Sequence, residues 1–277
     1  MTLDEIILSA LSEDIGDGDH TSLATIPQSA NGRAHLLVKE SGILAGMEVA
    51  QAVFKAVNPE ILFKPLLKDG TAVEPGMIAF EVNGPSRDLL SAERLALNFM
   101  QRMSGIATKT NYFVKMVEGT GAVILDTRKT TPNFRLIEKW AVRIGGGQNH
   151  RTGLYDMILI KDNHVDFAGG IVNAISNTLE YLKKNNKSLP VEIEVRNLAE
   201  LKQVLDFGGV NRIMLDNFPL DRLKEAIKMV GGQYETEASG GITETTLRSI
   251  AETGVNFISV GALTHHIKSL DLSLKAF

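Results

Sequence analysis

Residues 191–241, VEIEVRNLAELKQVLDFGGVNRIMLDNFPLDRLKEAIKMVGGQYETEASGG, decide the fold class because short apolar runs alternate in them with amphipathic stretches. The apolar runs predict strands, and apolar residues at helical spacing predict helices. The predicted strands are Val191–Val195, Arg212–Leu215 and Tyr234–Ala238, and the predicted helices are Leu198–Phe207 and Leu220–Val230. Strands that alternate with helices indicate parallel strands joined by helical crossovers. The sequence therefore predicts an α/β protein.

The same alternation continues on both sides of this stretch, with about 22 residues from one strand to the next in the last four units. Further strands are predicted at Ala122–Leu125, Met157–Ile160 and Phe257–Val260, and further helices at Arg135–Ile144, Ile171–Lys183 and Thr245–Thr253. Polar residues gather directly after the strands, where an α/β barrel has its active site. A doubly wound open sheet would also bind its ligand there. The barrel is the preferred prediction, and the open sheet remains the alternative.

The first hundred residues follow a different pattern, with strands at Ala34–Val38 and Ile78–Val82 and a helix around Met47–Val57. They predict a small separate α+β unit. A long helix is predicted from Ser91, as its N-cap, towards Met103. Its polar stripe consists of Arg94, Asn98 and Arg102. Near the C-terminus, leucines alternate with polar residues from 270 to 274, which indicates a strand that leaves the barrel and pairs with the N-terminal unit.

Composition excludes several classes of protein. Apolar residues make up 44% of the 277 residues and charged residues 22%, as in ordinary globular proteins. The absence of cysteine excludes disulfides, thiolate zinc sites and a cysteine nucleophile. The net charge of −4 predicts neither a nucleic-acid nor a membrane partner, so any anion site must be a local basic cluster. Acidic Asp4 and Glu5 do not fit a signal peptide, and the sequence predicts a soluble, cytoplasmic protein.

Three loops bring basic residues to the ends of predicted strands. Arg128 and Lys129 lie in the loop 126–132, which favours anion binding, although a solvated basic loop is the alternative. Three glycines at 145–147 lead to His150 and Arg151, and they indicate either a helix C-cap or a close approach of backbone to a ligand. Lys161 follows a strand, where it could bind phosphate, form a Schiff base or remain a surface lysine.

Two acidic residues alternate on the strand Val191–Val195, so Glu192 and Glu194 face the same side of it. A carboxylate buried inside a barrel needs a cation, which predicts a metal ion or an arginine next to Glu194. Asp216 ends the next strand and is the expected neighbour of Glu194. Two carboxylates beside phosphate-binding groups suit Mg²⁺. An ion pair with the basic loops is the alternative.

Small residues end the last two strands and are expected to bind a phosphate through their backbone N–H groups. They are Ser239, Gly240 and Gly241, followed by Gly261 and Ala262. The acidic stretch 14–19 lacks the spacing and the closing glutamate of a calcium-binding EF-hand and is interpreted as a turn.

Taken in order, these motifs resemble the quinolinate phosphoribosyltransferase family, from about residue 13 to the C-terminus. The motifs that carry the resemblance are Glu93-Arg94 with Asn98, Ser104–Thr108, Asp126–Pro132, Gly145–Arg151, Lys161–His164, Glu192–Glu194, Asp216-Asn217, Ser239–Gly241 and Gly261–His265. The sequence is also similar to a paralogue of this family from molybdenum operons, whose members tend to lose the Asn-His-Arg and Lys-Asp-Asn-His segments that are intact here. Asn133, Trp140 and Arg196 depart from the more common family residues without touching an inferred catalytic side chain.

The resemblance implies an N-terminal α/β sandwich domain, residues 1–108, joined to an open, incomplete α/β (TIM-like) barrel, residues 109–268. The tail 269–277 is expected to pack back on the N-terminal domain. The resemblance also implies a homodimer or a larger oligomer in which the neighbouring subunit completes each active site with Arg94.

The resemblance further implies roles for individual residues. Those expected to hold the two carboxylates of quinolinate are Arg94, Arg128, His150 and Arg151. Lys129 and Lys161 are expected to face the phosphates of phosphoribosyl pyrophosphate, and Glu194 and Asp216 to serve Mg²⁺-pyrophosphate and the ribose hydroxyls. Those expected to bind the 5′-phosphate are Ser239, Gly240, Gly241, Gly261 and Ala262, with His265 nearby in sequence.

The implied reaction is the transfer of a phosphoribosyl group to the quinolinate nitrogen, followed by loss of the 2-carboxylate as carbon dioxide, which gives nicotinate mononucleotide for NAD biosynthesis. Two competing hypotheses are kept. A barrel enzyme that uses Lys161 as a Schiff-base nucleophile would give a covalent adduct that borohydride traps. A non-catalytic, ligand-binding paralogue would be expected to lack inferred catalytic residues, and none is missing.

Overall fold

The computed structural model describes all residues from Met1 to Phe277, and they form two compact units. Unit 1 consists of Met1–Asn111, Thr130–Gly146 and Ala262–Phe277. Unit 2 consists of Tyr112–Lys129 and Gly147–Gly261. The chain passes between the units several times, whereas the predicted boundaries cut it only near residues 108 and 268.

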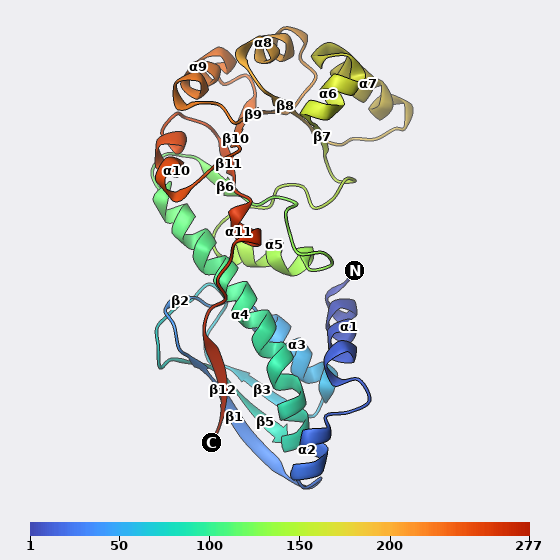
Figure 1. Ribbon diagram of the computed structural model, residues 1–277, viewed down its shortest axis with the longest axis vertical. Helices are drawn as coiled ribbons and strands as arrows, with labels where there is room; N and C mark the ends of the chain where they lie inside the picture. The colour runs from blue at the N-terminus through green and yellow to red at the C-terminus, as the bar shows by residue number, and fades with distance from the viewer. The chain divides into compact units, whose positions relative to one another are not determined.

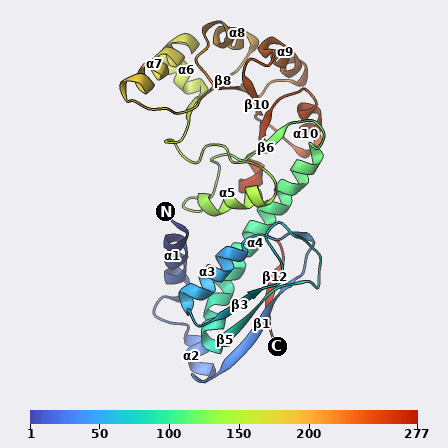
Figure 2. The same ribbon diagram turned by 180° about the vertical axis from the view of Figure 1, so that it is seen from behind.

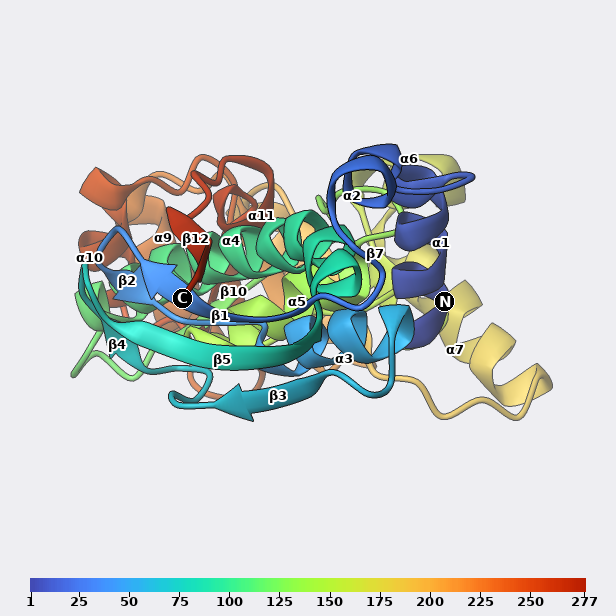
Figure 3. The same cartoon turned by 90° about the horizontal axis from the view of Figure 1, so that it is seen from below.

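Unit 1 is built on a four-stranded antiparallel sheet in the order β12-β1-β5-β3. Its strands are β1 (Asn31–Val38), β3 (Leu62–Pro65), β5 (Ile78–Pro85) and β12 (Leu272–Ala276), and the strands β2 (Gly42–Ile43) and β4 (Ala72–Val73) form a separate pair. Figure 3 shows β1, β5 and β3 side by side. The tail thus contributes β12, in which Leu274 pairs with Leu36 of β1.

The helices of unit 1 include one that is much longer than predicted. They are α1 (Leu3–Ile15), α2 (His20–Thr25), α3 (Met47–Val57), α4 (Ser86–Met116), α5 (Arg135–Ile144) and α11 (Ala262–His265). The prediction that a helix begins at Ser91 was wrong, because α4 begins at Ser86 and continues well beyond Met103. The Ser91 hydroxyl donates instead to Asp19 and to the carbonyl of Arg87. Figure 2 shows α4 running past the four-stranded sheet, and Gln101 on α4 donates to the carbonyl of Leu272 in β12.

Residues 130–146 belong to unit 1 because one buried carboxylate ties them to α4. Arg102 on α4 donates to Oε1 of Glu138 at 2.7 Å and to the carbonyl of Thr264 at 2.6 Å. Thr131 donates to Glu138 through both its backbone N–H and its hydroxyl. Glu138 is fully buried, so these donors satisfy a charge that would otherwise be costly to bury.

Unit 2 contains a parallel six-stranded sheet in the order β6-β11-β10-β9-β8-β7. The strands are β6 (Val123–Leu125), β7 (Ile158–Ile160), β8 (Val191–Val195), β9 (Arg212–Asp216), β10 (Glu235–Ser239) and β11 (Phe257–Ser259). The first strand of this unit, β6, thus lies beside its last strand, β11, as in a barrel. No pairing joins β6 to β7, so the barrel is open.

The helices of unit 2 are α6 (Asp162–Ala168), α7 (Ile171–Lys184), α8 (Leu198–Phe207), α9 (Leu220–Val230) and α10 (Glu244–Ala251). Figure 1 shows α7, α8, α9 and α10 on the same side of the strands, which favours a barrel over a doubly wound sheet with helices on both faces. The predicted α/β class and open barrel are therefore confirmed. None of the helices in the structure is both long enough and apolar enough to span a bilayer.

Candidate active site

The strand register of unit 2 places polar side chains in successive rows on the inner face of the sheet. Glu194 of β8 and Glu237 of β10 both pair with Met214 of β9, so their side chains share this face. Asp216 pairs with Ser239 one row further towards the carboxyl ends of the strands. We call this end, with Lys161, Glu194 and Asp216, the rim.

The cation that faces Glu194 is Lys161. Their Nζ and Oε2 atoms are 2.9 Å apart, and the Glu194 side chain is 7% exposed whereas that of Lys161 is 46% exposed. The requirement for a cation was predicted correctly, but Lys161, which directly follows the neighbouring strand β7, supplies it in place of the predicted metal ion or arginine. The backbone N–H of Lys161 donates to Nδ1 of His164 at 2.9 Å. This hydrogen bond fixes the junction of Lys161 with α6, a helix that the sequence did not predict.

Asp216 is held by the residue that follows it. Asn217 donates through Nδ2 to Asp216 at 2.6 Å, and its backbone N–H donates to the carbonyl of Ser239 at 2.8 Å. Asn217 has a φ of 53°, in the left-handed region that asparagine tolerates. A Cβ atom at Gly240 would collide with the Asn217 amide. Glycine at this position therefore permits the contact that orients Asp216.

Two carboxylates on one face, Glu194 and Asp216, provide the hard oxygen ligands that Mg²⁺ prefers. Both lie on adjacent strands, and Asp216 is partly exposed. The donor set therefore fits a magnesium ion that keeps several water molecules.

Buried Asp126 anchors the segment that carries His150 and Arg151. It follows β6, and its carboxylate accepts hydrogen bonds from the Asn149 side chain at 2.5 Å and from the His150 backbone at 2.9 Å. Arg128 and Lys129 are exposed in the loop after it, where the backbone N–H of Lys129 donates to the Thr127 hydroxyl. The sequence marked Asp126 only as the start of a motif, so its anchoring role was missed.

Arg151 lies in an environment that favours an added anion. Burial lowers the pKa of Arg151, the nearby charge of Arg128 lowers it further, and Glu192 and Asp156 oppose this shift. Its Nη1 donates to the carbonyl of Met157 at 3.3 Å. Two arginines that repel each other in a partly desolvated place are stabilised when a carboxylate binds between them.

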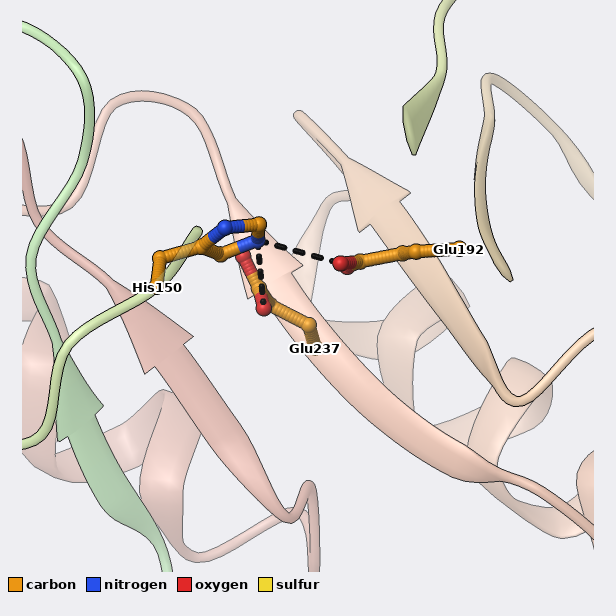
Figure 4. A group of neighbouring side chains, drawn as sticks. All are labelled: His150, Glu192 and Glu237. Carbon is orange, nitrogen blue, oxygen red and sulfur yellow. Dashed lines mark ion pairs between the residues drawn. The ribbon is translucent and has the colours of Figure 1, made fainter. Parts of the chain in front are cut away.

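Three buried side chains form what we call the buried triad, namely His150, Glu192 and Glu237 (Figure 4). Nε2 of His150 is 3.0 Å from Glu192 and 3.5 Å from Glu237. Burial raises the pKa of Glu192 to about 7. Burial, and after it the charge of Glu192, raise the pKa of Glu237 to about 7. Arg212 contacts Glu237 at 3.1 Å.

Sequence reasoning missed Glu237 and Arg212 as site residues. The strand register could have revealed them. Arg212 pairs with Glu192 on one side and with Glu235 on the other, and Glu194 and Glu237 lie in the next row towards the rim. Polar residues at alternate positions of three successive strands could have revealed the network.

The predicted phosphate-binding turns have the backbone freedom that they require. Gly240 and Gly241 have φ values of 87° and 60°, and α10 follows after Thr243. Gly261 ends unit 2, and Ala262 begins α11 in unit 1. His265 is exposed at the end of α11, where its ring contacts that of His266.

Arg94 belongs to unit 1 and is exposed on α4. Asn98, one turn further along α4, lines a groove of about 520 Å³. Helix α1 and residues 131–134 form its other walls.

An open α/β barrel with this rim, two arginines and glycine turns defines a barrel enzyme for anionic, phosphorylated substrates. Comparison with known families gives a narrower assignment. Residues 19–104 match the N-terminal domain of quinolinate phosphoribosyl transferase, and residues 106–275 match its C-terminal domain. The chain belongs to the quinolinate phosphoribosyl transferase family.

Individual relatives support this assignment over nearly the whole chain. A chloroplastic, carboxylating nicotinate-nucleotide pyrophosphorylase of Arabidopsis thaliana is 48% identical over 99% of this chain and 82% of its own length. A probable carboxylating nicotinate-nucleotide pyrophosphorylase of Bacillus subtilis is 40% identical over 95% of this chain and 89% of its own length. The solved nicotinate-nucleotide pyrophosphorylase of Francisella tularensis has a TM-score of 0.93 and 41% identity, over 99% of this chain and 96% of that one.

Proposed function

We propose that this protein transfers the phosphoribosyl group of phosphoribosyl pyrophosphate to quinolinate and releases pyrophosphate, carbon dioxide and nicotinate mononucleotide, a reaction of NAD biosynthesis. The relatives named as carboxylating nicotinate-nucleotide pyrophosphorylases support this reaction. The observation that carries it here is the electrostatic coupling of half-buried Arg151 to Arg128, on the unit that also carries the Lys161–Glu194 pair. Such an arrangement suits a dicarboxylate beside a polyphosphate.

Quinolinate would be held through its carboxylates. Arg128 and Arg151 supply planar donors for them, with His150 next to Arg151 in the chain. This binding would aim the pyridine nitrogen at C1 of the ribose, so that the approach geometry lowers the barrier to transfer.

The phosphoribosyl donor would lie along the rim. Lys129 and Lys161 would stabilise negative charge on the departing pyrophosphate. The turns at 239–241 and 261–262 would bind the 5′-phosphate through backbone N–H groups. Glu194 and Asp216 would hold Mg²⁺, which neutralises charge on the pyrophosphate oxygens when bound.

The transfer forms a bond between the pyridine nitrogen and C1 and breaks the bond from C1 to the pyrophosphate oxygen. The ring nitrogen then carries a positive charge. When the bond from C2 to the 2-carboxylate breaks, its electron pair stays on the cationic ring and carbon dioxide leaves. A proton from solvent replaces it at C2. The pyridine nitrogen attacks C1 with its lone pair and has no proton to lose, so the protein needs no general base for the transfer.

Three further points belong to the same proposal. A homodimer or larger oligomer would let Arg94 complete the active site of a neighbouring subunit, and the exposure of Arg94 on α4 is compatible with this role.

Quinolinate and phosphoribosyl pyrophosphate would be the only substrates, with no nucleic-acid or membrane partner. A cytoplasmic location stays a prediction, since several plant relatives are named chloroplastic or mitochondrial.

The reaction is tested by a turnover assay with phosphoribosyl pyrophosphate, Mg²⁺ and either quinolinate or nicotinate. We expect nicotinate mononucleotide and one equivalent of carbon dioxide from quinolinate, and no product from nicotinate. Product from nicotinate alone would contradict the dicarboxylate assignment, and borohydride trapping at Lys161 would favour a Schiff-base enzyme instead.

The shared site is tested by mixing two inactive variants. Arg94→Ala should remove activity without changing the fold, as should Lys161→Ala. If each site combines residues of two subunits, subunit exchange between the two variants should restore part of the activity, because some sites then contain neither substitution. Near-normal turnover by Arg94→Ala alone would contradict the shared-site proposal.

A further inference from the structure

His150 has a defined tautomer in this structure. Its Nδ1 accepts a hydrogen bond from the backbone N–H of Arg151, with 2.7 Å between the two nitrogens. A ring nitrogen that accepts a hydrogen bond carries a lone pair and no proton. The proton of the neutral imidazole is therefore on Nε2, as inferred from this hydrogen bond.

Two carboxylates from different strands lie close to this nitrogen. Glu192 on β8 and Glu237 on β10 approach Nε2 at 3.0 and 3.5 Å, and Figure 4 shows both carboxyl groups on this side of the ring. Both glutamate side chains are 0% exposed, and that of His150 is 6% exposed. Water therefore has little access to Nε2, and the two nearby carboxyl groups favour a proton on this nitrogen.

The carboxyl group of Glu237 is itself fixed by Arg212 on β9. Nη1 of Arg212 lies 3.1 Å from Glu237, Nη2 lies 3.1 Å from Glu235, and the guanidinium stacks 3.8 Å above the Phe257 ring centroid. An arginine held on three sides has little freedom to move, so it gives the network a rigid base.

These contacts form a continuous path from the strands to the substrate-facing arginine. Arg212 holds Glu237, the two glutamates face Nε2 of His150, and Nδ1 of the same ring holds the backbone N–H of Arg151. We infer that Glu192 and Glu237 are positioning residues, which hold His150 in its Nε2-protonated form and thereby aim Arg151 at a carboxylate of the substrate. This role for His150 rests on the proposed function.

The same three side chains could be taken for a metal site, since their ligand atoms all lie within 4.8 Å of one another. Two observations oppose this. The tautomer assigned above leaves no lone pair on Nε2, the nitrogen that faces the carboxylates. In addition, Arg212 already brings a positive charge to Oε2 of Glu237. The geometry therefore points to a positioning role through close charge contacts, and not to a metal site.

The test separates the two substrates kinetically. Glu192→Met and Glu237→Met remove the carboxyl groups at nearly constant length, and each should raise the KM for quinolinate about tenfold or more, because loss of one partner of a buried charge contact has an effect of at least this order. The KM for phosphoribosyl pyrophosphate should stay within about twofold of wild type. The Gln variants, which keep an acceptor oxygen, should show smaller increases.

Glu235→Gln is the matched control, because Glu235 contacts the same Arg212 and lies on the same strand as Glu237, but is exposed and lies one row away from Glu237. It should leave both KM values unchanged. Equal increases in both KM values for the Met variants would indicate a general structural defect and overturn the inference. Failure of wild-type protein to use quinolinate would instead overturn the proposed function, so the two failures are distinguishable.

Two further measurements remain informative if a Met variant folds poorly. In the His150→Ala background, Glu237→Gln should cause no additional rise in the KM for quinolinate, because its effect passes through the ring. In wild-type protein, ¹⁵N NMR of the histidine rings, assigned with His150→Ala, should show an unprotonated Nδ1 at His150. Additive effects, or a protonated Nδ1, would overturn the inference.

Discussion

Glu192 and Glu194 lie two residues apart on the same face of β8, yet their surroundings differ. Glu194 is at the rim, where it pairs with the half-exposed Lys161. Glu192 is fully buried one row deeper, faces His150, and has a pKa raised to about 7. We infer that the two positions on the strand have different roles. The rim would bind the substrates and carry the reaction, while the buried triad would hold neighbouring residues such as Arg151 in position.

The largest expected effect is at the rim. Lys161→Ala should lower kcat/KM by about 10³-fold or more, since removal of a preorganised charge that stabilises a leaving group costs a few kcal/mol in the transition state. Steady-state kinetics with quinolinate measure this effect, and circular dichroism checks the fold. A loss of less than tenfold would show that Lys161 is not part of the reacting site.

The next effect concerns the contact between Asn217 and Gly240. Gly240→Ala should raise the KM for phosphoribosyl pyrophosphate and lower the free energy of unfolding by about 1–3 kcal/mol. The new Cβ would collide with the Asn217 side chain, and alanine would be strained at the φ of 87° that residue 240 adopts. Denaturant unfolding and substrate titration measure the two changes. Gly232→Ala is the control, since Gly232 also has a positive φ but has open space around it. Equal kinetic effects in the two variants would contradict a specific role for the contact.

The buried triad should make stability depend on pH. The pKa of Glu237 is raised to about 7 from its ordinary value of 4.5, so the native state binds a proton that the unfolded state releases. The stability from this group is complete below about pH 4.5 and is lost as pH rises through about 7. Between pH 6 and 8, the free energy of unfolding of wild-type protein should fall by on the order of 1 kcal/mol more than that of Glu237→Gln, since one pKa unit corresponds to about 1.4 kcal/mol.

Unfolding by denaturant at several pH values gives the slopes for the two proteins. The comparison uses the slope with pH rather than absolute stability, because the Gln side chain also changes the contact with Arg212. Parallel curves would contradict a raised pKa at Glu237.

The smallest effect is expected just beyond the rim, at Arg196. This residue forms ion pairs with Asp166 and Glu200, and it departs from the residue more common in the family. Arg196→Ala should leave Tm nearly unchanged and kcat within about twofold, because exposed ion pairs contribute little. Thermal melting and kinetics measure both quantities. A large loss of activity would extend the rim to this position.

The sequence predicted the bounds of a helix best where a single apolar stripe runs along its whole length. The helices α3, α5, α8 and α9 have the predicted bounds, because a buried apolar stripe determines the length of each. The start of α4 was predicted wrongly because a serine resembles an N-cap whether or not a helix already precedes it. Helix α6 was missed because its motif had been interpreted only as a binding loop.

For the site, too, some residues could be predicted from the sequence and others could not. Residues at the carboxyl end of a strand, such as Lys161 after β7 and Asp216 at the end of β9, could be found from the sequence because parallel strands bring their carboxyl ends to one edge. The partners in the interior could not be found from spacing alone. The approach of Glu237 to His150 depends on the strand register and on the loop that Asp126 anchors, and both are tertiary features.

A crystal structure with quinolinate bound tests the division between the rim and the buried triad most directly. We predict carboxylate oxygens of quinolinate within hydrogen-bond distance of Arg151 and Arg128, while Glu192 and Glu237 keep their contacts with Nε2 of His150. A His150 ring turned away from the two glutamates, with a nitrogen on quinolinate, would contradict it.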